Sequence, residues 1–102
     1  MQLDDVINEI QSHRDNLKEL GHTVFFDLGD AGSVFLDTTE GRYQVTANPV
    51  NPDAECTITL SMEDLVKLMD GTLNPMAAFT MGKLKVFGSK GVALKFNSLL
   101  DA

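Results

Sequence analysis

The sequence predicts a single α+β domain over residues 1–102, with helices packed on a mostly antiparallel, five-stranded sheet. Apolar residues near the N-terminus recur at three- and four-residue steps, which is the period of an amphipathic helix, and an apolar segment after Gly88-Ser89 predicts a last helix. Between them lie short β-rich runs separated by turn residues. A chain of 102 residues buries enough surface for one hydrophobic core and is too short for a second domain.

The first predicted element is an amphipathic helix over residues 3–20. Acidic residues such as Asp4 and Glu9 lie off its apolar stripe. Gly21 is the predicted C-terminal cap, because glycine adopts the left-handed backbone of that position without strain. The stripe consists of Leu3, Val6, Ile7, Ile10, Leu17 and Leu20.

Three β-rich runs follow, at residues 23–28, 33–37 and 42–47. The turn sequences GDAG (29–32) and TTEG (38–41) separate them. Short turns between consecutive strands predict an antiparallel meander.

The segment 48–53 holds two prolines and two asparagines and is predicted to be a longer loop. A fourth strand follows at residues 55–60. Cys56, Ile58 and Leu60 alternate there with threonines, so this strand has one apolar and one polar face.

Two helices are expected next. Ser61 and Asp64 have the spacing of a capping box, and Gly71 ends the helix that they begin. The Asn-Pro pair at 74–75 begins a short helix that Gly82 closes, because proline is favoured at the first helical position.

A fifth strand with a basic outer face is expected at residues 83–87, and Gly88-Ser89 begins a last helix. The predicted order is helix, four strands, two helices, strand, helix. Because the final strand follows a helical crossover, it can pair with an early strand in parallel.

The charge is unevenly distributed along the chain. The net charge is −7, which disfavours duplex nucleic acid and anionic membrane surfaces as partners. Residues 1–64 carry a net charge of −10, whereas residues 65–102 carry +3 and are also richer in apolar residues. We therefore expect the functional site in the C-terminal third.

The sequence indicates a cytoplasmic protein. Its single cysteine, Cys56, excludes an internal disulfide. The N-terminus is acidic where a signal peptide would be basic, and no apolar run is long enough for a transmembrane segment.

Candidate catalytic groups are few. His13 and His22 lie in and just beyond the first helix, and Cys56 lies on the apolar face of a strand without a basic neighbour in sequence. We therefore expect no catalytic residue. The acidic residues near the turns match neither a calcium loop nor a paired-carboxylate site, and GDAGS lacks the lysine of a phosphate-binding loop. Neither a metal nor a cofactor is expected.

Four of the five methionines fall between residues 62 and 81. They have two interpretations, a hydrophobic core or an adaptable apolar pocket, and composition alone favours the core. Nearby lysines are most simply a solvated face, although a basic rim beside an apolar opening would suit an anionic lipid head group. These lysines are Lys83, Lys85, Lys90 and Lys95.

Residues 55–100 closely resemble the sterol carrier protein 2 domain family. The N-terminal helix and strands fit the family's order of elements more loosely. The resemblance rests on Cys56-Thr57-Ile58-Thr59, Gly71, Asn74-Pro75, Ala78-Phe79, Gly82-Lys83-Leu84-Lys85, Gly88, Ala93, Lys95 and Leu99.

The resemblance implies a helix-covered five-stranded sheet with an apolar tunnel that holds fatty acyl chains, acyl-CoA, sterols or phospholipids. It implies no reaction. Phe79 and Leu84 are the family-signature positions first expected to face the tunnel, and Pro75, Gly82 and Gly88 are expected to be structural. The predicted ligand-binding residues are Leu65, Leu68, Met69, Leu73, Met76, Phe79, Met81, Leu84, Val86, Leu94 and Phe96.

The main functional hypothesis is therefore a non-catalytic intracellular carrier of fatty acyl, acyl-CoA, sterol-like or isoprenoid ligands. An alternative is an accessory module that presents a lipid intermediate, such as a quinone precursor, to an enzyme complex. An enzyme acting on an acyl thioester is disfavoured, because no pair of nucleophile and base is visible.

The chain ends at Asp101-Ala102, without the peroxisomal Ser-Lys-Leu signal of animal relatives. This ending favours a freestanding, prokaryote-like cytoplasmic protein. An exposed apolar tunnel opening would favour a homodimer or an enzyme partner.

Overall fold

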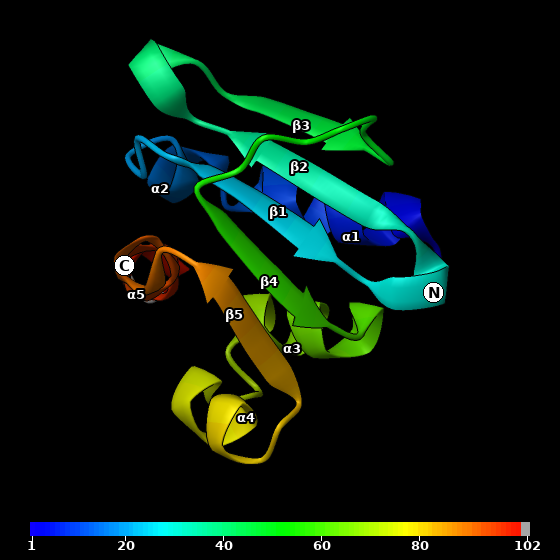
Figure 1. Ribbon diagram of the computed structural model, residues 1–102. Coiled ribbons are helices and arrows are strands. Elements are labelled where there is room, and N and C mark those ends of the chain that lie inside the picture. The colour runs from blue at the N-terminus through cyan, green and yellow to red at the C-terminus, as the bar shows by residue number, and fades with distance from the viewer. Residues whose placement is uncertain (101–102) are drawn as a thin grey trace.

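Figure 1 shows a computed structural model of the protein, which describes residues 1–100. The predicted α+β class is confirmed, with a five-stranded sheet and helices. Two short 3-10 turns, η1 (Gly29–Ala31) and η2 (Thr39–Gly41), connect the first three strands. The helices and strands are α1 (Leu3–Ser12), α2 (Arg14–Leu17), β1 (Thr23–Asp27), β2 (Ser33–Asp37), β3 (Gln44–Ala47), β4 (Cys56–Leu60), α3 (Met62–Asp70), α4 (Pro75–Thr80), β5 (Leu84–Gly88) and α5 (Lys90–Leu100).

The strands lie in the order β3-β2-β1-β4-β5. The predicted meander β1-β2-β3 is antiparallel, and β4 and β5 also pair antiparallel, so the mostly antiparallel sheet is confirmed. Within residues 1–100, the parallel pairing with an early strand that the helical crossover permits for the last strand does not occur, because β5 pairs only with β4, in the antiparallel sense. The parallel pair is β1 with β4, from Val24 opposite Cys56 to Asp27 opposite Thr59. After β3 the loop crosses back past β2 and lays β4 beside β1 (Figure 1).

Alternating side chains of the strands give the sheet one buried face. In β1 the buried residues are Val24 and Phe26, and in β4 all three apolar residues predicted for the inner face are buried. Within residues 1–100 the helices pack on this face, with α1 against α3 and α5 against β4 and α2 (Figure 1). The opposite face carries the half-buried Phe25 and Phe35, which are opposite each other in the register.

The N-terminal helix differs from its predicted span of residues 3–20. It is interrupted at His13, where φ is −102° and ψ is 13°, and the second segment ends at Leu17. The Ser12 hydroxyl donates a hydrogen bond of 2.6 Å to the Glu9 carbonyl, a local interaction that competes with regular helix geometry. Gly21 is left-handed, as predicted, but it lies beyond the end of α2 and turns the chain into β1.

The third strand starts later than predicted, at Gln44. Arg42 still belongs to the turn, because its N–H donates to the Thr39 carbonyl at 2.8 Å. The Tyr43 hydroxyl donates to the Ile10 carbonyl at 3.3 Å, and the Arg14 guanidinium lies 5.1 Å from the centre of the Tyr43 ring. Tyr43 therefore binds the N-terminal helices, whereas Arg42 binds the turn and Asp37 at the end of β2, where the Arg42 Nε lies 3.7 Å from the Asp37 carboxylate.

The predicted starts of α3 and α4 are confirmed. The Ser61 hydroxyl accepts from the Asp64 N–H at 3.0 Å, although the structure of residues 1–100 shows no return bond that would complete a capping box. Gly71 ends α3 in the left-handed conformation with φ of +85°. The Asn74 side-chain oxygen accepts from two backbone N–H groups of α4, and Pro75 occupies the first helical position.

Gly88 is the last residue of β5 rather than the start of the final helix. Its φ is +84°, and a Cβ at this position would lie 2.6 Å from the Glu55 carbonyl oxygen. The same oxygen accepts from the Ser89 N–H at 2.9 Å, and the Ser89 hydroxyl accepts from the Val92 N–H at 3.2 Å. Close backbone approach at Gly88 therefore holds the start of α5 against β4.

Substitution of Phe26 tests the packing between the sheet and α5. The centre of the Phe26 ring lies 5.2 Å from the centre of the Phe96 ring of α5, and both side chains are almost completely buried. Phe26→Ala is expected to lower the free energy of unfolding by about 3–5 kcal/mol, because it leaves a cavity between sheet and helix. Urea unfolding measures the change. Phe25→Ala, on the opposite face, is the matched control and should cost less than half as much; equal losses would contradict the assigned faces.

Gly88→Ala tests the junction between β5 and α5. We expect it to lower the free energy of unfolding by about 2 kcal/mol or more, because the methyl group adds a backbone clash to the left-handed strain. Gly29→Ala is the control, since Gly29 has φ of +65° but no atom within 4 Å of the position that an added methyl group would take. Chemical denaturation that ranks Gly29→Ala as the more damaging substitution would refute this account.

Candidate ligand-binding pocket

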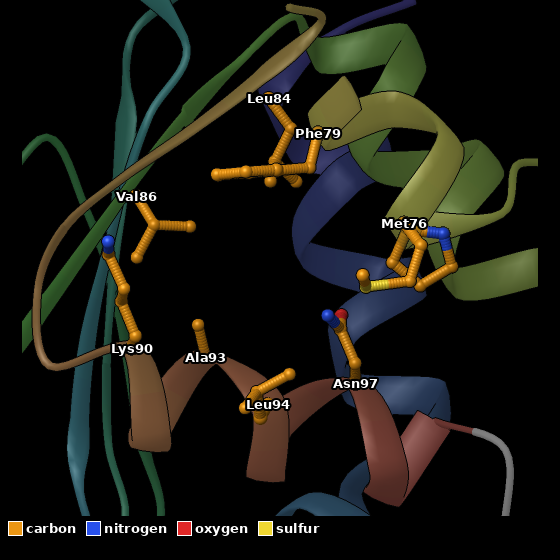
Figure 2. Close-up of a pocket in the computed structure, with 9 residues that line it drawn as sticks. Met76, Phe79, Leu84, Val86, Lys90, Ala93, Leu94 and Asn97 are labelled. Carbon is orange, nitrogen blue, oxygen red and sulfur yellow. The ribbon is translucent and has the colours of Figure 1, made fainter. Parts of the chain in front are cut away.

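An apolar pocket of about 170 Å³ opens between α4, β5 and α5. Figure 2 shows its side chains around a central space, with Phe79 and Leu84 on one side and Ala93 and Leu94 on the other. The pocket therefore lies in the C-terminal third, where the sequence predicted the functional site. Its walls consist of Pro75, Met76, Phe79, Leu84, Val86, Lys90, Ala93, Leu94 and Asn97.

Local sequence patterns bring these side chains together. The Asn-Pro start places α4 beside β5, and strand alternation turns Leu84 and Val86 toward the helices. On α5, the lining residues lie three, four and seven positions apart, which places them on one face of a helix. Three short periodic segments thus form one concave surface.

The rim of the pocket is apolar and exposed to solvent, whereas its floor is buried. Met76 is 65% exposed, Phe79 49% and Leu94 59%, but Leu84 is only 5% exposed. Clustered large apolar side chains at a protein surface are typical of a binding site. The pocket can therefore accept an apolar molecule from outside.

A second hollow of about 280 Å³ lies next to the first, and Pro75 and Asn97 line both. It is more polar, because backbone and side-chain groups of the α3–α4 turn contribute to it. Its walls consist of Leu68, Gly71, Thr72, Leu73, Asn74, Pro75, Asn97 and Leu100.

The structure places the eleven predicted ligand-binding residues in four locations. Five line the apolar pocket, and Leu68 and Leu73 line the second hollow. Met81 is 62% exposed and lies on neither wall. Buried in the core instead are Leu65, Met69 and Phe96. The five on the pocket wall are Met76, Phe79, Leu84, Val86 and Leu94.

Sequence reasoning left out Pro75, Lys90, Ala93 and Asn97 as lining residues. Helical spacing was the signal that could have found three of them, because positions 90, 93 and 97 share a face with Leu94. Lys90 was noted only as part of a basic rim.

No histidine, cysteine or carboxylate lines this pocket among the residues that the structure describes. His22 lies before β1, and its Nδ1 is 3.1 Å from the Glu55 carboxylate. Hydrogen bonds from His22 and from the Thr23 N–H lower the pKa of Glu55. Over residues 1–100, no group of three or more potential metal ligands lies close enough together to hold a metal ion.

Cys56 lies behind the α5 wall of the pocket. Its side chain is completely buried, which raises the pKa of the thiol, although a hydrogen bond with the Ala93 backbone lowers it. A buried thiol that stays protonated is a poor nucleophile. Cys56 therefore behaves as a small core residue.

No helix within residues 1–100 combines the length and the apolar character that crossing a membrane requires. The fold and pocket define a class of small α+β domains with an apolar hollow between the last strand and the last helix. Residues 3–101 match the sequence pattern of the SCP-2 sterol transfer family. The chain belongs to this family, which confirms the resemblance inferred from residues 55–100.

Comparison with individual proteins gives the same family assignment. The chain is 35% identical over 88 residues to sterol carrier protein 2 of Gallus gallus, covering 81% of this chain but only 16% of that protein. The solution structure of sterol carrier protein domain 2 of Helicoverpa armigera is 30% identical, with a TM-score of 0.71 over 86% of this chain and 72% of that one. The structure of the ubiquinone synthesis protein UbiJ-SCP2 is 28% identical, with a TM-score of 0.66, and the match covers 88% of this chain and 76% of that one.

Thiol chemistry tests the buried state of Cys56. The native thiol is expected to react at least about a hundredfold more slowly with a disulfide reagent at pH 8 than the urea-unfolded chain, because reaction requires opening of the core. Absorbance of the released thiolate measures both rates. Comparable rates in the two states would show that Cys56 is accessible and would reopen a role for it in chemistry.

Proposed function

We propose that the protein is a non-catalytic intracellular lipid carrier that holds a fatty acyl, acyl-CoA, sterol-like or isoprenoid ligand in its apolar pocket. The single observation that carries this proposal is the solvent-open apolar pocket between α4, β5 and α5. Membership of a sterol transfer family and the name of the Gallus gallus relative support the same class of ligand.

The driving force is the transfer of an apolar chain from water to the pocket. Each buried CH₂ group contributes roughly 0.8 kcal/mol, reduced by the entropy lost when the ligand is held. The pocket of about 170 Å³ is smaller than the roughly 300–1,000 Å³ of most small-molecule sites. Exposed, unbranched Met76 and the short helix α4 are the parts of the wall that we expect to adjust to a larger ligand.

The absence of a reaction is part of the proposal. The described pocket wall offers no histidine, cysteine or carboxylate, and the buried Cys56 thiol is held in its protonated form. Binding and release then follow the ligand's concentration, without a covalent intermediate.

An accessory role is the second candidate function. The similarity to UbiJ-SCP2, a ubiquinone synthesis protein, favours a module that presents a lipid intermediate such as a quinone precursor to an enzyme complex. The exposed rim of the pocket would then face an enzyme partner or a second copy of the chain.

Phe79→Asp tests the pocket. We expect it to weaken binding of a fluorescent fatty acid by at least about tenfold, because it places a carboxylate on an apolar wall. Phe87→Asp is the matched control: Phe87 is 56% exposed on the opposite face of β5, and this variant should bind the probe as the wild type does. Urea unfolding must show that both variants fold.

The carrier proposal fails if Phe79→Asp and Phe87→Asp lose the probe equally, or if Phe79→Asp binds it as well as the wild type. Native mass spectrometry of the purified protein, followed by organic extraction, identifies any lipid that it carries. A protein that is empty and also does not bind the fatty acid would favour the accessory role.

A further inference from the structure

Lys90 is the one charged residue among the nine that line the apolar pocket. Figure 2 shows it at one end of the space, beside Val86, with Asn97 and Met76 at the other end. Within residues 1–100 the Lys90 ammonium takes part in no ion pair and no side-chain hydrogen bond. Its charge is therefore available to a molecule in the pocket.

The elements around Lys90 reinforce this charge. The segment from Gly71 to Leu100 contains four lysines and no aspartate or glutamate, although the whole chain has a net charge of −7. All three walls of the pocket, α4, β5 and α5, belong to this stretch. An anionic group at Lys90 thus meets no carboxylate from the pocket walls.

The positions of the polar groups define a direction along the pocket. Lys90 and Asn97 are seven residues apart on α5, or about 10 Å along a helix, with Ala93 and Leu94 between them. A cation at one end of an apolar surface matches a molecule with an anionic end and an apolar chain. At the Asn97 end the second hollow begins, where Leu73 and Leu100 offer further apolar surface.

We propose that Lys90 makes the pocket selective for single-chain lipids with an anionic end group, a carboxylate or a phosphate. The end group pairs with the Lys90 ammonium, and the chain runs along α5 past Leu94 toward Asn97. This inference rests on the proposed function, because it requires that the pocket binds lipid. Charge-assisted hydrogen bonds between ammonium and carboxylate or phosphate supply the selectivity, while the apolar walls supply the affinity.

Competition for a neutral fluorescent lipid tests the proposal with three ligands of equal chain length: dodecanoate, dodecyl phosphate and methyl dodecanoate. We expect wild-type protein to bind at least one anionic ligand about tenfold more tightly than the ester. Lys90→Met should remove this preference by weakening binding of the anionic ligand relative to the ester. Lys95→Met is the control, because Lys95 lies on the same helix but not on the pocket wall.

Comparing dodecanoate with dodecyl phosphate shows which anionic group Lys90 binds. If Lys90→Met loses the preference for dodecanoate or for dodecyl phosphate over the ester, the proposal is supported. An anionic preference that persists in Lys90→Met, or that Lys95→Met removes equally, overturns it. Wild-type protein that binds the ester but shows no anionic preference overturns the role of Lys90 and leaves the carrier function intact. Protein that binds none of the lipids overturns both.

Discussion

The parallel pairing of β1 with β4 joins the two halves of this molecule. The first half forms the meander and its helices, and the second contains every wall of the pocket. The register places Phe26 opposite Ile58, so the buried faces of both halves continue into one another. Phe26 of the first half can therefore contact Phe96 of the last helix. Strand β5 pairs with β4, and α5 packs against β4 and α2, so the position of β4 beside β1 ties the pocket walls to the first half of the molecule.

The pocket forms where this core is incompletely covered. Strand β5 lies at the edge of the sheet, and α4, which packs beside it, has only six residues. A short helix cannot cover the whole apolar face of an edge strand, so Val86 stays partly exposed while Leu84 is buried. Gly88 fixes the opposite wall through close contact with the Glu55 backbone. The site thus combines a rigid back wall with an exposed rim of flexible side chains.

Local charge matters more for this site than the net charge of the chain. A net charge of −7 predicts repulsion of anions, but the acidic residues concentrate in residues 1–64. Salt screens charges over about 8–10 Å, so a ligand at Lys90 responds mainly to groups near the pocket. The elements that form the walls of the pocket contain lysines and no acid. The acidic residues therefore lie mainly before residue 65, and the elements that line the pocket carry lysines instead.

By itself, the sequence determined the α+β class, the strand positions and the caps at Ser61 and Asn74, because alternation and capping depend on nearby residues. It could not determine that β4, rather than β5, makes the parallel pair, since pairing depends on contacts between distant segments. Nor could the sequence separate pocket residues from core residues. Leu65 and Leu94 are both leucines on the apolar face of a predicted helix, yet Leu65 is fully buried and Leu94 is 59% exposed. Only the tertiary structure decided this difference, because burial depends on which elements pack over each helix face.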